Sequence, residues 1–258
     1  MINIRNKCNY LVVIFVATII GCGCGGGGDK TPSPKPTTQT PTSTSSVCGT
    51  SDVCIFEESL SEQWTMSIYE GDTDESFVGT NGTTINSYWD VIDLQDDDHG
   101  MVVDIKLFQS SGYADFSFKP IIAGDLESVS YHVVDLSSYL AGELVYDLRV
   151  VDWADNEIGM FMNLQCGWPC RSQFFPVANQ TGVNTIAPPG FPLKLNANEW
   201  QEVRIPMQYF VNDNLSSSDP WLDLTKINVI SISPPWEKVE AQRNVHYQID
   251  NLRIEAPH

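Results

Sequence analysis

The sequence predicts an all-β fold, an antiparallel β-sandwich or jelly roll, and three observations carry this prediction. Several segments alternate apolar and polar residues with a period of two, which is typical of strands that bury one face. Turn-forming residues separate these segments at short intervals. No long segment shows the helical apolar period, so the strands are expected to pair without crossover helices.

The individual elements follow from local patterns. Half-buried strands are predicted where apolar and polar residues alternate, at residues 103–107, 146–150 and 202–205. Central strands are predicted where both faces are largely apolar, at residues 160–164 and 227–232. Single helical turns are predicted at residues 136–140 and 207–211.

Composition excludes one class of function. The chain has 258 residues, of which 42% are hydrophobic and 18% are charged, so it can bury a real core. It carries 33 Asp and Glu against 14 Lys and Arg, a formal net charge of -19. Such a surface repels phosphate backbones, which argues against nucleic acid as a partner.

The first 21 residues predict a lipoprotein signal peptide. Arg5 and Lys7 precede an apolar run at residues 11–20 that is too short to span a bilayer. The run leads into Gly21-Cys22, and this end resembles the lipobox of bacterial lipoproteins, where the peptidase cuts before a cysteine that carries diacylglycerol. The resemblance implies lipidation of Cys22, and the Gly that follows implies sorting to the outer membrane. An ordinary secretory signal is the alternative.

Residues 22–47 predict a tether. They are first Gly-rich and then rich in Pro, Thr and Ser, and they offer no segment able to form a core. An extended chain of this length reaches roughly 75 Å. We therefore expect a domain at residues 48–258 to be held away from a membrane of the bacterial cell envelope, on its periplasmic or its outer side.

Four cysteines of the predicted domain fall into two close pairs. Cys48 and Cys54 lie at its start, and Cys166 and Cys170 bracket Gly-Trp-Pro. Outside the cytoplasm such pairs predict two local disulfides. A zinc site is the alternative, but it needs four ligands, and no histidine is spaced to join either pair.

Four stretches carry a resemblance to a known family. They are GELVYDLRVVDW at residues 142–153, MNLQCGWPC at 162–170, EWQEVRIP at 199–206 and VHYQIDNLR at 245–253. Together they resemble the galactose-binding-like jelly-roll domain at the C-terminus of exo-1,3/1,4-β-glucanases. The resemblance covers about residues 55–256 and implies carbohydrate binding. In those enzymes a catalytic domain precedes the module, whereas here an anchor and a tether are predicted, so binding without catalysis is expected.

Sugars are bound by an aromatic ring that stacks on their apolar face and by planar polar groups around it. Three tryptophans in predicted loops are candidates for stacking, and three polar residues are their predicted hydrogen-bonding neighbours. The candidates are Trp168, Trp153, Trp236, Arg149, Gln165 and Arg171. Core packing is the alternative for each tryptophan, and a solvated strand face is the alternative for Arg149. Trp64, Trp89 and Trp200 lie in strand patterns and are expected to pack.

A structural Ca²⁺ is a further expectation. Related jelly rolls often hold this ion between the first and last strands, and it requires several oxygen ligands. The matching residues are Glu57 or Glu58 near the start and Asp250 near the end. A solvated edge carboxylate is the alternative.

No catalytic residues are predicted. Nucleophile-elbow, phosphate-loop and His-Glu-x-x-His patterns are not found in the sequence, and His132 and His246 lie within strand patterns. The leading hypothesis is a non-catalytic, lipid-anchored protein that holds a polysaccharide, β-glucan-like, at the cell envelope. The alternatives are a structural module that binds an envelope protein and, third, a glycan-cleaving enzyme.

Overall fold

The structure is a computed structural model, and it describes residues 47–71, 87–95, 98–108, 113–121, 132–167, 169–180, 188–212, 222–235 and 239–257. All of these ranges belong to one compact unit, Ser45–His258. Cys22, Trp168 and Trp236 lie outside the described residues. Among the residues described, no helix is both long and apolar enough to cross a membrane.

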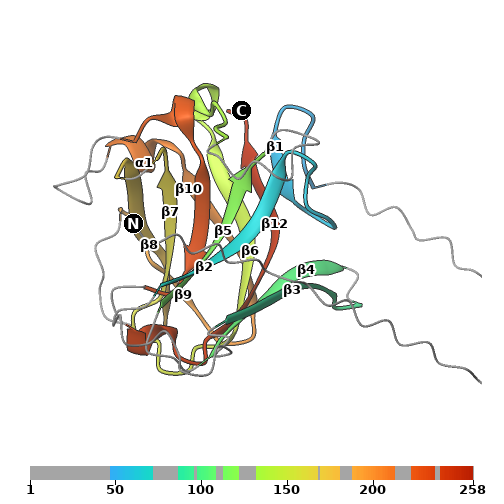
Figure 1. Ribbon diagram of the computed structural model, residues 1–258, viewed down its shortest axis with the longest axis vertical. Coiled ribbons are helices and arrows are strands. Elements are labelled where there is room, and N and C mark those ends of the chain that lie inside the picture. The colour runs from blue at the N-terminus through green and yellow to red at the C-terminus, as the bar shows by residue number, and fades with distance from the viewer. Residues whose placement is uncertain are drawn as a thin grey trace, which may run out of the picture. The chain divides into compact units, whose positions relative to one another are not determined.

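The described strands form two six-stranded sheets. Figure 1 shows how they are arranged in space. Sheet A contains β1 (Val53–Phe56), β3 (Ser87–Asp93), β4 (Met101–Leu107), β6 (Glu143–Asp152), β10 (Trp200–Pro206) and β12 (His246–Glu255). Sheet B contains β2 (Trp64–Gly71), β5 (Tyr113–Pro120), β7 (Met160–Gln165), β8 (Arg171–Asn179), β9 (Leu193–Leu195) and β11 (Val229–Ser233).

Strand order explains the all-β architecture. Sheet A runs β10-β6-β12-β4-β3 with β1 beside β12, and sheet B runs β2-β5-β11-β7-β8-β9. The described pairings are antiparallel except β8 with β9, which is parallel. Because neighbours in each sheet are seldom consecutive in sequence, the chain crosses repeatedly between the two sheets. The predicted antiparallel β-sandwich is confirmed.

The core lies between the sheets. Strand residues alternate between the two faces of a sheet, so every second side chain of each central strand points inward. Tyr146 and Tyr247 from sheet A and Phe116, Phe118 and Ile230 from sheet B are at most 1% exposed and belong to one apolar cluster. The remaining face of each sheet is an outer face, and the polar strand residues lie there.

Short helical turns cap the sandwich, and two of them lie at the segments where the sequence predicts helical turns. They are η2 (Ser137–Tyr139), α1 (Gln208–Asn212), η3 (Leu224–Lys226) and η4 (Val239–Gln242). The first falls within the segment predicted at residues 136–140, and the second overlaps the segment predicted at 207–211 and ends one residue later. Both predicted disulfides are also present, Cys48–Cys54 and Cys166–Cys170.

Candidate functional site

A row of polar side chains crosses five strands on the outer face of sheet B. Its members occupy directly opposite positions on neighbouring strands, so they lie side by side across about 19 Å of sheet. We call it the polar row, and its members, from β2 to β8, are Ser67, Ser117, Ser231, Asn163 and Gln173. Each strand alternates core and row residues, as in β7, where Met162 and Leu164 enter the core on either side of Asn163.

One end of the polar row has free hydrogen-bonding capacity. Oδ1 of Asn163 and Oε1 of Gln173 are buried and have no hydrogen-bond partner in the described part of the chain. At the other end, the Oγ atoms of Ser67 and Ser117 lie 3.2 Å apart and bond to each other. Buried polar atoms are normally satisfied, so the two amide oxygens indicate a place for a hydrogen-bonding ligand.

Apolar and charged side chains flank the two amides. On one side the rings of Phe161 and Phe175 meet edge to face with centroids 6.3 Å apart. On the other side Gln165 of β7 lies directly opposite Arg171 of β8, and both are half-buried. The surface therefore combines rings with planar polar groups, the combination that sugar binding requires.

The disulfide loop adjoins this end of the row. β7 ends at Gln165 and β8 begins at Arg171, and Cys166 and Cys170 close the connection between them. The amide of Gly167 donates to Oδ1 of Asn228 at 3.0 Å, which ties the loop to the start of β11. Two of the predicted ligand-binding residues, Gln165 and Arg171, are thus brought together as expected, beside the loop that contains position 168.

A buried carboxyl group lies on the same face. Asp115 of β5 accepts a hydrogen bond from the hydroxyl of Ser233 at 3.1 Å. Burial raises the pKa of Asp115 to about 6, and the bond from Ser233 offsets only part of that shift. Near neutral pH this carboxylate is ionised at a cost to stability.

The raised pKa of Asp115 predicts how stability depends on pH. Between about pH 4 and pH 6 the unfolded chain loses this proton while the folded chain keeps it, so folding becomes less favourable as pH rises. Asp115→Asn removes this dependence. The melting temperature of the variant relative to the wild type should therefore rise by at least about 3 °C between pH 4 and pH 7.5 in calorimetry. A difference that is constant with pH would contradict the assignment.

Two predicted ligand-binding residues do not lie on this face. Trp153 was expected in an exposed turn, but it is 7% exposed and belongs to the core cluster, because the chain turns at Ala154, a left-handed residue with φ 46°. Arg149 lies on β6 of the other sheet, with its guanidinium carbon 5.4 Å from the ring centroid of Trp200. The expectation that these residues join Gln165 is wrong.

Trp200 also differs from its prediction. It was expected to pack within the sandwich, as Trp64 does at 3% exposure. Instead it is half-buried on the outer face of sheet A, where its ring stacks on His99 with centroids 4.1 Å apart and planes 19° apart. The alternation of β10 already indicates this, since Val203 and Ile205 fill the core and Trp200 has the opposite parity.

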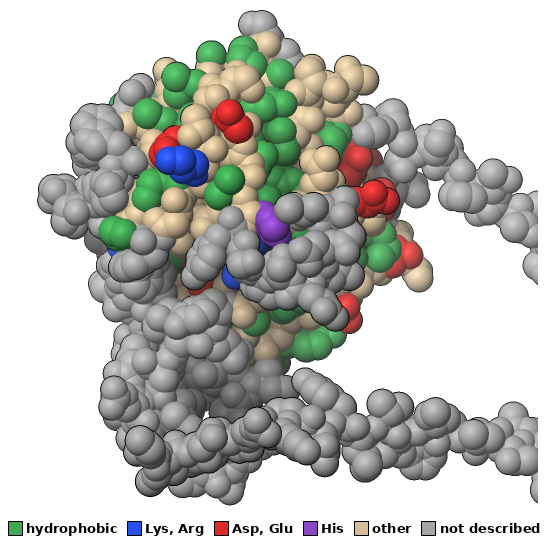
Figure 2. Space-filling model, turned by 45° about the horizontal axis from the view of Figure 1, so that its top comes forward, with side chains coloured by type: hydrophobic (Ala, Val, Ile, Leu, Met, Phe, Trp, Pro, Cys, Tyr) green, Lys and Arg blue, Asp and Glu red, His purple; other side chains and the backbone are tan. Residues whose placement is uncertain are grey.

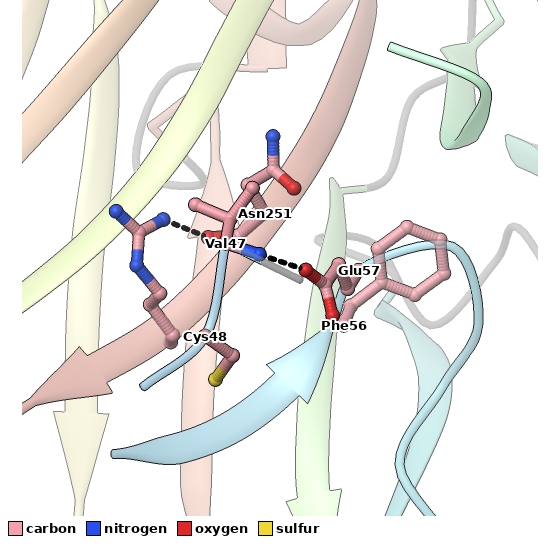
Figure 3. A pocket seen from close by; sticks show the side chains of 6 residues that line it. Val47, Cys48, Phe56, Glu57 and Asn251 are labelled. Carbon is pink, nitrogen blue, oxygen red and sulfur yellow. Dashed lines mark hydrogen bonds between the residues drawn. The ribbon is translucent and has the colours of Figure 1, made fainter. Parts of the chain in front are cut away.

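The predicted calcium ligands do not converge. The carboxylate of Glu57 accepts from the amide of Val47 beside a small pocket (Figure 3), and that of Glu58 accepts from the amide of Met101 at 3.0 Å. Among the described residues, neither glutamate belongs to a group of ligand atoms with Asp250. These residues do not fit the predicted site, and Asp250 lies with other partners, described below.

The surface charge is sparse and mostly negative. The face seen in Figure 2 shows hydrophobic and uncharged side chains with few Lys or Arg, and several Asp or Glu lie along one edge. This distribution offers no basic patch among the described residues of that face. It agrees with the net charge of -19 and disfavours a polyanionic ligand.

The sequence did not single out Asn163, Gln173, Phe161 or Phe175. Residues 160–164 were interpreted as apolar on both faces, although Asn163 and Gln165 share one parity and the core residues have the other. The signal that could have identified Asn163 was its position as a polar residue within an apolar run. Which strand lies opposite could not be derived from sequence, and only the pairing of β7 with β8 brings the two amides together.

Known proteins that are similar to this chain were found by comparison of structures and not by comparison of sequences. No protein-family model matches the chain, and no curated protein is similar to it in sequence. Its structure is similar to a family 30 carbohydrate-binding module, with 14% identity, a TM-score of 0.47, and coverage of 80% of this chain and 88% of the module. The family 30 module of the cellulosomal cellulase Cel9D-Cel44B of Clostridium thermocellum is also similar, with 13% identity, a TM-score of 0.46, and coverage of 80% of this chain and 97% of the module. An exo-β-agarase is similar with 11% identity, a TM-score of 0.42, and coverage of 79% of this chain and 25% of the agarase.

Proposed function

We propose that the chain is a non-catalytic carbohydrate-binding protein whose ligand lies on the outer face of sheet B. The observation that carries the proposal concerns the amide oxygens of Asn163 and Gln173, which have no partner in the described part of the chain and lie opposite each other on neighbouring strands. Sugar hydroxyls donate the hydrogen bonds that these atoms lack. The half-buried ring of Phe175, which packs edge to face on the buried Phe161, supplies an apolar surface for the C–H face of a sugar.

A polysaccharide suits this face better than a single sugar does. The polar row crosses five strands, about 19 Å, which is longer than one sugar ring. Trp168 is proposed as a stacking platform at the end of the face marked by Gln165 and Arg171, because it lies between the two bridged cysteines. Trp236 is proposed as a second platform, because it follows the Pro234-Pro235 segment after β11.

The charges favour a neutral glycan. The net charge of the chain is -19, which repels sulfated and uronic polysaccharides. On the face itself the carboxylate of Asp115 interacts with the positive charges of Lys119 and Arg171 and offsets part of them, so no strong excess of positive charge attracts an anion. A β-glucan is the proposed class. Calcium is not required by this proposal, and its binding stays a prediction.

The proposal includes a location. The resemblance of the segment that ends in Gly21-Cys22 to a lipobox supports a lipid on Cys22, and the Pro/Thr/Ser-rich residues that follow support a tether. The chain would then hold polysaccharide close to the outer membrane. Mass spectrometry of the protein isolated from its membrane tests this part, because lipidation adds diacylglycerol to a chain that begins at Cys22.

The binding proposal is tested by affinity electrophoresis of the full chain through gels that contain laminarin, mixed-linkage glucan, cellulose derivatives, agar or an anionic glycan. We expect retardation in a neutral glucan gel. Gln165→Ala should reduce the retardation several-fold, because it removes a planar amide beside the two unpartnered oxygens. Gln201→Ala is the matched control, since Gln201 is an exposed amide on the other sheet.

Unimpeded migration through every gel would reject the carbohydrate proposal. Retardation that is lost with Gln201→Ala and kept with Gln165→Ala would place the site on sheet A instead. Capture of a defined envelope protein by the full chain, without glycan retention, would support the alternative of a protein-binding module.

A further inference from the structure

A second cluster of functional groups lies on the outer face of sheet A, away from the polar row. It joins His99 from the connection between β3 and β4, Asp147 from β6 and Asp250 from β12. Nδ1 of His99 is 3.1 Å from Oδ2 of Asp250 and 4.0 Å from Oδ2 of Asp147. The three ligand atoms all lie within 4.8 Å of one another.

The shortest of these distances, 3.1 Å, is that of a hydrogen bond between His99 and Asp250, and it also fits two ligands of one metal ion. Zn²⁺ binds histidine nitrogen and carboxylate oxygen at about 2.0–2.2 Å, so two of its ligands lie roughly 3–3.5 Å apart. The distance from Nδ1 of His99 to Oδ2 of Asp250 already has this value. The distance to Oδ2 of Asp147 is longer, and a small rotation of the Asp147 side chain would shorten it. Three distinct elements thus direct one ligand atom each toward a common point.

Among the described residues, the two carboxylates have the imidazole of His99 as their ion-pair partner, and that ring carries a charge only when it is protonated. Asp147 and Asp250 are directly opposite on neighbouring strands, where like charges repel. Within the described part of the chain, no Lys or Arg forms an ion pair with either of them. The cation on the same strand, Arg149, lies over the ring of Trp200 instead.

Neighbouring groups hold the ligands in place. Nδ2 of Asn251 donates to Oδ2 of Asp147 at 2.7 Å, and the amide of Asn251 donates to Oδ1 of Asp250 at 2.7 Å. Asn251 has φ 52° at the irregularity in the pairing of β12 with β6, so the bulge positions both carboxylates. The indole of Trp200 fixes the plane of the His99 ring by stacking on it.

We propose that His99, Asp147 and Asp250 bind a divalent transition metal ion, for which Zn²⁺ is the probe. One nitrogen and two carboxylate oxygens form a donor set typical of such ions, whereas Ca²⁺ requires six or more oxygens. Three protein ligands leave a position for water. The ion would link the connection that carries His99 to the two central strands of sheet A.

The test is isothermal titration of the full chain with Zn²⁺ and, separately, Ca²⁺ after treatment with a chelator. We expect one Zn²⁺ per chain at this site, and weaker or no binding of Ca²⁺ by these three residues. His99→Gln should weaken Zn²⁺ binding at least about tenfold. Asn251→Gly keeps the left-handed backbone but removes the bond to Asp147, and it should weaken binding about tenfold as well.

His246→Gln is the matched control. His246 is another half-buried histidine of sheet A, and its Nε2 lies 2.6 Å from Asp104, so it tests whether any His-Asp pair suffices. Zn²⁺ affinity should be unchanged in this variant. Thermal unfolding of each variant in chelator shows whether the fold is intact. Absence of Zn²⁺ binding by the folded wild-type chain, or binding that His99→Gln leaves unchanged, would overturn the proposal.

Discussion

Replacing Asn163 and Gln173 together by alanine is expected to lower the affinity for a neutral glucan by about 100-fold without destabilising the protein. Each amide oxygen has no partner in the described residues, so a ligand hydroxyl would supply one, and its loss then removes a hydrogen bond of the complex. In the free protein the same substitutions remove two buried amide oxygens that have no partner among the described residues, which leaves the free energy of unfolding unchanged or raises it.

Titration calorimetry with glucan oligosaccharides and urea unfolding of the same samples measure the two effects. The opposite directions of the two changes distinguish binding residues from structural ones. Gln201→Ala on the other sheet should change neither quantity. A double variant that loses stability while keeping its affinity would show that the two amides are structural.

Gln242→Ala is expected to lower the free energy of unfolding by about 3 kcal/mol, more than any other single substitution of a glutamine proposed above. Gln242 is 4% exposed. Its Oε1 accepts from the amide of Ala114 at 2.7 Å, and its Nε2 donates to the carbonyls of Ala114 at 2.8 Å and Pro234 at 3.0 Å. Alanine leaves those three backbone groups buried and unsatisfied, and it frees the Pro234-Pro235 segment that leads to Trp236.

Equilibrium unfolding in urea measures this loss as a lower transition midpoint. Gln208→Ala is its control, because Gln208 is an exposed amide at the start of α1. We expect that control to stay within about 0.5 kcal/mol of the wild type. A loss below about 1 kcal/mol for Gln242→Ala would mean that water replaces the amide group.

Much of the fold could be predicted from the sequence because strand periodicity is a local property. The alternation at 103–107, 146–150 and 202–205 gives β4, β6 and β10, since the core side chains recur at every second position. The apolar run at 227–232 similarly contains most of β11. Strand order could not be obtained in this way, because pairing of β12 with both β6 and β4 joins segments about 100 residues or more apart.

The candidate site was predictable only in part for the same reason. Gln165 and Arg171 flank a short disulfide loop, so their proximity follows from sequence, and the structure places them together. Arg149 was grouped with them by residue type, yet it lies on the other sheet. Asp250 was paired with Glu57 or Glu58 by analogy between chain ends, whereas the bulge at Asn251 directs it toward His99.

The most direct test of the central conclusion is a crystal structure of the full chain with a glucan oligosaccharide that the gel experiments identify. We expect sugar rings over the outer face of sheet B, with hydroxyl groups donating to Oδ1 of Asn163 and Oε1 of Gln173 and a ring face near Phe161 or Phe175. An oligosaccharide bound instead to the outer face of sheet A, beside Trp200 and Arg149, would contradict it.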